Sequence, residues 1–366
     1  MKKVAFVVIG INSGGIENYL LRFLKYSKSE IEPIVICTKK AEGALIEEFK
    51  ALNIQIITKK VSYFNLIYFS RLYRFLNSYK FNAICDFSGD FSAFTLLISR
   101  MAGIDNRMAF YRNSKFQFKM SSAKWLYVKI LKSVLRLSKS KILANSEYAL
   151  DVFHPEWRKN EKTVYRIIHN GVPYKTLPSN SNGQLLKHSL NIPNNCKVIG
   201  HVGNFRKAKN HDTIINIAKS IVSKNKFVRF LLVGNEVKEG ITNTLKRNNI
   251  ESYFIMPGIR KDIPELLNIM DVFLFPSTDE GQPNALIEAM LYEVPVFASN
   301  IPTIEECTPK EIKKYLFPPN DHQSISNAIL DYLVTEKIYN VKKVSAWAKI
   351  EFNPEARFEE FLNELI

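Results

Sequence analysis

Residues 271–289 read DVFLFPSTDEGQPNALIEA. The apolar run, 272–276, is short and continuous, which is typical of a strand buried on both faces of a parallel sheet. A loop with Gly and Pro follows, and apolar residues at helical spacing begin after Pro283. Strand, turn and helix in this order predict a parallel sheet covered by helices.

The same pattern recurs from one end of the chain to the other. In the first half, the expected strands are 3–9, 33–38, 54–58, 83–87, 107–111, 141–145 and 164–169. In the second half, they are 198–203, 228–234, 253–257, 272–276, 295–299 and 314–317. Helix-length segments separate these runs, so the sequence predicts an α/β protein with two doubly wound, Rossmann-like parallel sheets.

The length of 366 residues exceeds that of most single domains and favours two. Residues 173–195 are polar and rich in Asn, Ser and Pro, and we expect them to form a linker. They separate an N-terminal domain, 1–172, from a C-terminal domain, 196–348, and the last residues, 349–366, are helical by pattern.

Charge and cysteine usage limit the classes of function. Residues 1–170 contain 28 Lys or Arg and 13 Asp or Glu, a net charge of +15 out of +16 for the whole chain. Within them, 106–146 has ten basic residues and no acidic one, which would attract a polyanion or an anionic lipid surface. The four cysteines are far apart and form no CxxC, so we expect neither a zinc site nor disulfides, and a reducing cytoplasm.

A glycine-containing turn follows the first expected strand. Gly14 and Gly15 open a helix, where backbone N–H groups can approach a phosphate or sugar. The alternative is an ordinary strand-to-helix turn. The full GxGxxG fingerprint is missing, which argues against a nicotinamide-dependent enzyme.

Two carboxylates flank the loop of the opening stretch. Glu280 follows the strand 272–276, and Glu288 lies about a turn inside the next helix. Carboxylates placed on either side of a helix N-terminus can bind hydroxyl groups on both sides of a diphosphate. The pair points to a sugar-nucleotide site; the alternative is an acidic loop followed by one solvated glutamate.

The surrounding motifs closely resemble the donor domain of the family 4 retaining glycosyltransferases, which have the GT-B fold. The motifs are 259–267 (IRKDIPELL), 271–277 (DVFLFPS), 280–290 (EGQPNALIEAM), 200–211 (GHVGNFRKAKNH) and 169–172 (HNGV). In the first half, only 14–17 and 145–147 match, as expected for the variable acceptor domain of this family. The resemblance implies that the first domain binds an acceptor, that the second binds a nucleotide sugar with the reaction in the cleft between them, and that the last helix crosses back onto the first domain.

The resemblance also implies roles for individual residues. Glu280 would lie against the donor sugar and align the reacting centre, Glu288 would hold the ribose hydroxyls, and Lys209 would bind the diphosphate. The remaining donor-binding residues would be Gly15, Gly203, Gly281, Gln282, Pro283, Asn284 and Ala285.

We expect no metal ion and no other cofactor. Lysine, arginine and a helix N-terminus can stabilise the charge that builds on a leaving diphosphate. The chain has no DxD motif, and none of its six histidines has a partner at metal-ligand spacing.

Two positions depart from the family pattern. The Arg usually found after the glycine of the loop is here Asn204, and we expect Arg206 to supply the missing charge to donor binding and catalysis. Where many relatives carry a histidine, this chain has Arg112, which cannot act as a general base at ordinary pH but could hold a phosphate of the acceptor. The alternative is that Arg112 is one of many basic residues in this segment.

Residues 123–140 predict an amphipathic helix with a basic stripe, formed by Lys129, Lys132, Arg136 and Lys139. The apolar residues expected on the opposite face are Tyr127, Ile130, Leu131, Val134 and Leu135. With Phe116, Phe118 and Trp125 as anchors, this helix would dock on an anionic membrane. The alternative is a helix that packs on the sheet and leaves its lysines in water.

Together with these features, the resemblance implies a retaining, metal-independent glycosyltransferase that moves a hexose or N-acetylhexosamine from a UDP-linked sugar to a lipid-linked or polysaccharide acceptor. The resemblance implies bacterial cell-surface polysaccharide synthesis: capsule, exopolysaccharide or lipopolysaccharide. We expect a cytoplasmic protein, peripheral on the inner face of the cell membrane, without a nucleic-acid partner. The alternatives are a nucleotide-sugar epimerase of the same fold and a non-enzymatic protein that binds polyanions or membranes.

Overall fold

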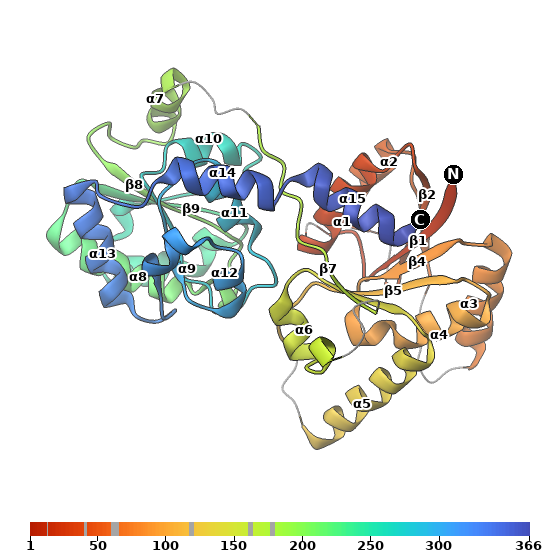
Figure 1. The fold of residues 1–366 in the computed structure, drawn as a ribbon. Helices are drawn as coiled ribbons and strands as arrows, with labels where there is room; N and C mark the ends of the chain where they lie inside the picture. Colours follow the sequence, from red (N-terminus) through yellow and green to blue (C-terminus); the bar gives the residue numbers. More distant parts are fainter. Residues whose placement is uncertain (13, 40–41, 60–65, 117–120, 160–163, 176–179) are drawn as a thin grey trace. The chain divides into compact units, whose positions relative to one another are not determined.

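Two parallel β-sheets organise the chain, one in each of two units (Figure 1). Unit 1 comprises Met1–Gly171 and Pro354–Ile366, and unit 2 comprises Val172–Asn353. The computed structural model describes all residues except 13, 40–41, 60–65, 117–120, 160–163 and 176–179. Among the described helices, none combines the length and the apolar character needed to cross a bilayer.

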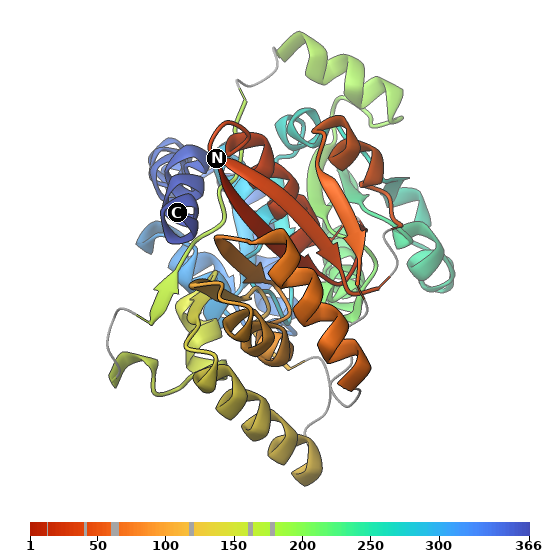
Figure 2. The ribbon, with the colours of Figure 1, turned by 90° about the vertical axis from the view of Figure 1, so that its right-hand side faces the viewer.

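The sheet of unit 1 has seven strands in the order β3-β2-β1-β4-β5-β6-β7, and every pairing is parallel. Figure 2 shows its first strands in red and orange. The strands are β1 (Lys2–Val8), β2 (Ile31–Cys37), β3 (Gln55–Thr58), β4 (Ala83–Asp86), β5 (Asn106–Tyr111), β6 (Lys141–Ala144) and β7 (Tyr165–Ile167). Each coincides with an expected strand.

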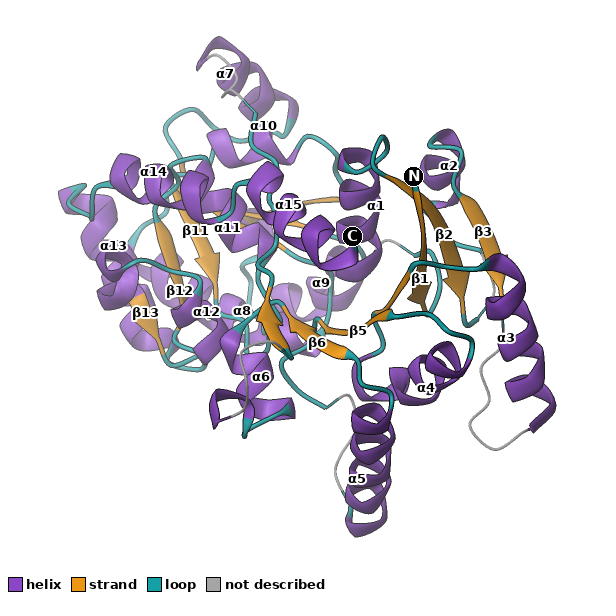
Figure 3. Cartoon of the chain, turned by 45° about the vertical axis from the view of Figure 1, so that its right-hand side comes forward, coloured by secondary structure: helices purple, strands orange, loops and turns teal. Residues whose placement is uncertain are grey.

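Helices cover both faces of this sheet (Figure 3). Successive side chains of a strand point to opposite faces, so Phe6 of β1 packs into one core and Val7 into the other. The first core includes side chains of α1 (Gly15–Tyr26), α2 (Ile46–Ala51) and α15 (Pro354–Leu365). The second includes side chains of α3 (Leu66–Tyr79), α4 (Ala93–Met101), α5 (Ser122–Leu137) and α6 (Glu147–Phe153).

The last helix, α15, belongs to unit 1 although it follows unit 2 in sequence. It buries Phe358, Phe361, Leu362 and Leu365 in the first core. We expected the last segment to begin at residue 349, but unit 2 extends to Asn353. Helix α14 (Val341–Glu351) continues past residue 349, and Phe352 lies in a core of unit 2. Proline is favoured in the first turn of a helix because it lacks an N–H group, and α15 begins at Pro354.

Unit 2 contains a six-stranded parallel sheet in the order β10-β9-β8-β11-β12-β13. Its strands are β8 (Lys197–Val202), β9 (Val228–Val233), β10 (Phe254–Gly258), β11 (Val272–Phe275), β12 (Val296–Ser299) and β13 (Leu316–Phe317). Its other helices are α7 (Asn180–Ser189), α8 (His211–Lys224), α9 (Val237–Arg247), α10 (Ile263–Asn268), α11 (Asn284–Leu291), α12 (Pro302–Glu306) and α13 (His322–Thr335). The two sheets confirm the predicted fold class and all the expected strands.

The prediction of a linker over 173–195 was wrong for most of the described part of that segment. Residues 180–189 form α7, and Leu186, Leu190 and the buried Ile192 pack on a core of unit 2. The polar composition favoured a linker, but these few apolar side chains are sufficient to attach the segment to the neighbouring core. Residues 176–179 of the expected linker lie outside the described residues.

Candidate functional site

The candidate donor site of unit 2 lies where the strand order reverses. Strands β8 and β11 are neighbours, and the chain proceeds from them toward opposite edges of the sheet. Loops that follow two such strands diverge and leave room for a ligand at the carboxyl edge. The loop after β8 contains 203–210, and the loop after β11 contains 276–283.

These two loops are joined by an ion pair between Lys209 and Glu280. Lys209 Nζ lies 2.7 Å from Glu280 Oε1, and the side chains are only 19% and 12% exposed. The Lys209 ammonium also lies 4.6 Å from the centre of the Phe275 ring. A Cβ at Gly203 would come within 3.1 Å of the lysine Cδ and Cε atoms, so the glycine leaves room for the lysine stem.

Backbone contacts hold the two loops in this arrangement. Thr278 N donates to Ala208 O at 2.8 Å. Asn210 has the left-handed backbone conformation (φ 56°), and its amide donates to Pro276 O at 3.1 Å and to Pro319 O at 3.0 Å. Asn210 therefore links the loops that follow β8, β11 and β13.

The second predicted carboxylate, Glu288, lies on α11, which begins at Asn284. Pro283 occupies the N-cap position and has no side-chain group that could accept a hydrogen bond from the first turn. Backbone N–H groups at such a terminus favour an anion. Gly281, Gln282 and Ala285 are partly buried in or next to this turn, so the structure brings the predicted loop to the same edge as Lys209 and Glu280.

Asn204 and Arg206 differ in their environments. Asn204 Oδ1 accepts a hydrogen bond of 3.0 Å from Asn235 N, which ties the loop after β8 to the loop after β9. Arg206 is exposed at the start of the 3-10 helix Lys207–Lys209. The asparagine thus has a bridging contact of its own, and the guanidinium of Arg206 lies at the surface of the loop.

A buried pair of histidines beside Lys209 was missed in the sequence. The rings of His201 and His211 lie 5.4 Å apart, and His201 Nδ1 is 2.9 Å from Leu274 O. Burial lowers the pKa of His201 far below its usual value and, with help from the Lys209 charge, lowers the pKa of His211 to about 4. Both imidazoles are neutral at pH 7. The signal available in the sequence was the position of each histidine beside a buried run.

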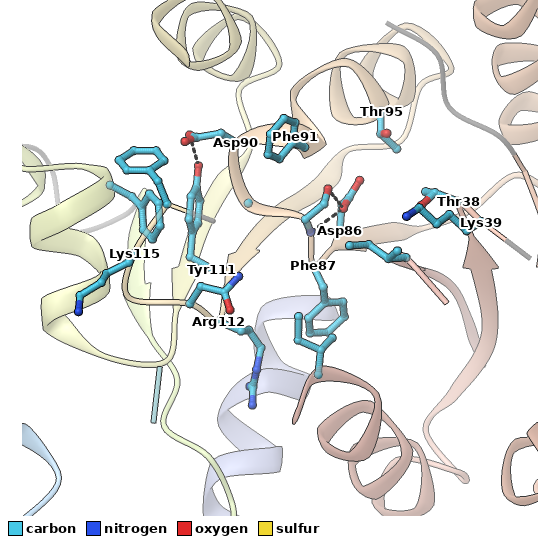
Figure 4. Close-up of a pocket in the computed structure, with 17 residues that line it drawn as sticks. Thr38, Lys39, Asp86, Phe87, Asp90, Phe91, Thr95, Tyr111, Arg112 and Lys115 are labelled. Carbon is cyan, nitrogen blue, oxygen red and sulfur yellow. Dashed lines mark hydrogen bonds between the residues drawn. The ribbon is translucent and has the colours of Figure 1, made fainter. Parts of the chain in front are cut away.

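Unit 1 has a cavity of ≈ 440 Å³ at the carboxyl edge of its own sheet, where β1 and β4 are neighbours (Figure 4). Apolar side chains, two carboxylates and two lysines line it, among them Ile9, Phe87, Phe116, Asp86, Asp90, Lys39 and Lys115. Tyr111 donates from its hydroxyl to Asp90 Oδ1 at 2.7 Å. The backbone N–H and hydroxyl of Ser88 donate to Asp86, whose pKa burial nevertheless raises to about 6.

Arg112 lines this cavity, but its guanidinium points away from Asp86 and Asp90 (Figure 4). It lies over the Tyr19 ring at 3.7 Å and donates from Nη2 to Asn170 Oδ1 at 2.6 Å. Burial lowers the pKa of Arg112 to about 10, so it still carries its charge at pH 7. Its Nη1 is buried and has no hydrogen-bond partner among the described residues. Gly15, which was predicted to bind the donor, is the first residue of α1, and a Cβ added there would meet no atom within 4 Å.

The basic helix α5 differs from its predicted arrangement. Leu131 and Leu135 are buried as expected, and Tyr127 and Val134 pack beside them. Ile130, expected on the packed face, is 49% exposed, because it lies at the edge of that face rather than at its centre. Trp125, Leu126 and Leu137 are also exposed, so the outer side of α5 carries apolar as well as basic groups.

The basic residues of α5 have various partners. Lys129 lies 3.5 Å from the centre of the Trp125 ring, and Arg136 pairs with Glu156 at 3.0 Å. Lys132 donates to Phe153 O, and Lys139 is exposed just after the helix. Phe116 packs at the second core of unit 1 and is therefore no surface anchor, whereas Phe118 lies outside the described residues.

Residues 184–346 match the model of the family described as Glycosyl transferases group 1, so unit 2 carries a domain of this family. Together with the two doubly wound parallel sheets, this domain defines the chain as a glycosyltransferase of the GT-B fold. The predicted resemblance and fold class are confirmed.

Curated relatives and solved structures agree with this class. The chain is 27% identical to the UDP-Gal:alpha-D-GlcNAc-diphosphoundecaprenol alpha-1,3-galactosyltransferase of Escherichia coli, over 76% of this chain and 73% of that protein. It is 25% identical to the capsular polysaccharide biosynthesis glycosyltransferase CapH of Staphylococcus aureus, over 82% of each. The structure of HepE from Anabaena in complex with UDP covers 99% of both chains with a TM-score of 0.82 at 19% identity, a likeness of fold.

Proposed function

We propose that this glycosyltransferase transfers a hexose or N-acetylhexosamine from a UDP-sugar to a lipid-linked or polysaccharide acceptor in bacterial cell-surface polysaccharide synthesis. The observation that carries the proposal is the meeting of Lys209 and Glu280 at the strand-order reversal of unit 2, next to the N-terminus of α11. The names of the Escherichia coli and Staphylococcus aureus relatives support the setting and favour transfer over epimerisation.

In this proposal the donor lies along the carboxyl edge of the unit 2 sheet. Lys209, Arg206 and the first turn of α11 bind the diphosphate, while Glu288 accepts hydrogen bonds from the ribose. Glu280 accepts one from the donor sugar. Gly203, Asn204 and the loop 281–285 shape the same surface.

The proposed reaction is retaining and independent of metal. The bond between the anomeric carbon and the diphosphate oxygen breaks, and the acceptor hydroxyl oxygen bonds to the same face of that carbon. The hydroxyl proton passes to the departing diphosphate. Lys209 and Arg206 supply positive charge that stabilises the negative charge on this leaving group.

The acceptor would enter the cavity of unit 1 that Asp90 and Tyr111 line. A carboxylate and a phenol can exchange hydrogen bonds with sugar hydroxyls, and the apolar walls suit the faces of a sugar ring. Arg112 stays a candidate for an acceptor phosphate through Nη1.

We further propose that unit 1 associates with the membrane through α5. The support is the combination of Lys129, Lys132, Arg136 and Lys139 with the exposed apolar side chains of the same helix. The amino-terminal end of α5 projects from unit 1 (Figures 1 and 3), which leaves this surface accessible in the unit.

The test of the proposed function is a binding screen with UDP, GDP, ADP and their common sugar conjugates, read as the shift in melting temperature. A ligand that binds only the folded protein raises this temperature by mass action. We expect a response selective for UDP compounds that Glu288→Ala weakens and the matched surface variant Glu239→Ala on α9 leaves intact. Lack of response to every nucleotide would contradict the proposal, and conversion of a UDP-sugar to its epimer without acceptor would replace it.

A further inference from the structure

A second cavity of unit 1 lies at the opposite edge of its sheet, where β6 and β7 begin and α5 ends. Its volume is ≈ 440 Å³, and its walls include Lys132, Arg136, Lys139 and Lys141. It shares no lining residue with the cavity of Asp86 and Asp90, and the proposed transfer of a sugar makes no use of it.

Among the described residues around this second cavity, positive charge exceeds negative charge. Arg136 pairs with Glu156, and Lys141 lies 2.7 Å from Glu364 Oε2. Glu364 also accepts from Arg166 Nε at 3.1 Å. Among the described residues named here, these two carboxylates face five cations, which are Lys132, Arg136, Lys139, Lys141 and Arg166. Lys139 is exposed and adopts the left-handed conformation (φ 52°), which directs the chain away from the end of α5.

The cavity also contains a buried polar group that is unsatisfied among the described residues. His154 is 6% exposed, lines the cavity, and has no described hydrogen-bond partner at Nε2. A buried imidazole nitrogen without a partner costs free energy. Burial and the neighbouring Lys132 lower the pKa of His154 to about 3, so the imidazole is neutral at pH 7. The tautomer with the proton on Nε2 can donate one hydrogen bond to an anion in the cavity.

The surroundings of the cavity indicate where such an anion comes from. Helix α5 contributes three of the lining residues and has no acidic residue. Trp125, Leu126, Ile130 and Leu137 are between 49% and 61% exposed on the same helix. A phosphate site at the end of a helix that also exposes tryptophan and leucine side chains fits a phospholipid headgroup at the surface of a bilayer.

We propose that this cavity binds the phosphate of an anionic phospholipid headgroup while the exposed apolar side chains of α5 enter the acyl region. The cavity makes membrane association specific for a headgroup, whereas a basic stripe alone responds only to surface charge. The inference stands independently of the donor site in unit 2.

The test measures binding of the full chain to monomeric short-chain phosphatidylglycerol, and to phosphatidylcholine vesicles with and without phosphatidylglycerol. The cavity variant is Arg136→Gln with Lys139→Asn, because asparagine tolerates the left-handed conformation of residue 139. The matched control is Lys219→Gln with Lys224→Gln on α8, which removes the same charge from exposed positions of unit 2. A third variant, Trp125→Ser with Ile130→Ser, removes apolar anchors.

We expect the cavity variant to weaken binding of the short-chain lipid about tenfold, the loss of roughly one charge-assisted hydrogen bond, with an unchanged melting temperature. The α8 control should bind as the wild type does. The apolar variant should lose vesicle binding and keep the short-chain lipid. In NMR spectra of the wild type, the signals of the His154 ring should shift when the lipid saturates the protein. His154→Gln, which lacks these signals, identifies them.

Three results would overturn the inference. The first is equal binding of the short-chain lipid by the cavity and α8 variants. The second is competition by inorganic phosphate as strong as that by the lipid, which would make the cavity a site for free phosphate. The third is loss of binding in the apolar variant alone, for the short-chain lipid as well as for vesicles, which would leave the cavity without a role.

Discussion

At the scale of single residues, the ion pair between Lys209 and Glu280 affects the binding of the donor. In the proposed function both groups bind the donor. In the structure, however, they form an ion pair with each other at 2.7 Å. Part of the binding free energy of a diphosphate is therefore spent on separating them. The largely buried position of the pair makes this cost larger than for an exposed ion pair.

Glu280→Gln is thus expected to have opposite effects on UDP and on turnover. The variant should bind UDP several-fold more tightly, since Lys209 is free to meet the diphosphate, and it should transfer sugar more slowly. Calorimetric titration with UDP and a transfer assay check the two effects. Lys209→Met is the comparison variant and should lose UDP affinity. Equal UDP affinity in Glu280→Gln and the wild type would show that the pair does not oppose binding.

The buried histidine His211 makes the stability of unit 2 depend on pH. Its pKa is about 4 in the folded chain, against about 6.5 for an unperturbed histidine. Between these values the unfolded chain binds a proton that the folded chain does not. The free energy of unfolding should therefore fall as the pH drops from about 6.5 to about 4, by up to about 3 kcal/mol from this group.

His211→Phe retains an aromatic ring beside Phe205 and His201 and removes the titration. Urea unfolding across this pH range should show a weaker pH dependence in the variant than in the wild type. Subtracting the two curves cancels the contribution of other groups, including Asp86, whose raised pKa acts in the opposite direction. Parallel curves for the variant and the wild type would show that His211 does not contribute to the pH dependence.

At the scale of elements, α15 completes a core of unit 1 from the far end of the chain. The Phe361 ring lies 4.6 Å from that of Phe23 on α1 and 5.4 Å from that of Phe110 on β5. Lys2 Nζ donates to Ile366 O at 2.7 Å, which joins the two ends of the chain. The helix is therefore part of the hydrophobic core of unit 1.

Phe361→Ala is expected to lower the free energy of unfolding of unit 1 by about 3–5 kcal/mol, the usual cost of removing a fully buried aromatic ring. Glu359→Ala on the exposed side of α15 is the control and should change it by less than about 0.5 kcal/mol. Denaturant unfolding of both variants measures the difference. Similar small effects would mean that α15 is not packed as described.

At the scale of the whole molecule, the charge is concentrated in the first 170 residues, with +15 of the net +16. Binding of anionic vesicles should therefore weaken steeply between low and physiological ionic strength, because salt screens exposed charges. UDP binding should respond less, since Lys209 is largely buried. Titrations with vesicles and with UDP at several salt concentrations test both expectations. If the two affinities fell equally with salt, the membrane surface and the donor site would not differ in how exposed their charges are.

The strands, the fold class and the two carboxylates of the candidate donor site could be predicted from the sequence. Apolar runs of strand length followed by turns are local signals, and neither Glu280 nor Glu288 needs a distant partner to be noticed. The packing of α7 could not be predicted, because three apolar side chains in a polar segment become informative only beside the core that they meet. The exposed position of Ile130 likewise depends on the width of the contact that α5 makes with its neighbours.

Contacts between segments far apart in sequence became visible in the three-dimensional structure alone. The Lys209–Glu280 pair, the Asn204–Asn235 bridge, the neutral His201–His211 pair and the two cavities of unit 1 each join residues from different loops or elements. A single sequence records which residues are present and how they repeat along the chain. Distances, burial and the resulting pKa shifts arise when the strand order of each sheet brings separate loops to one edge.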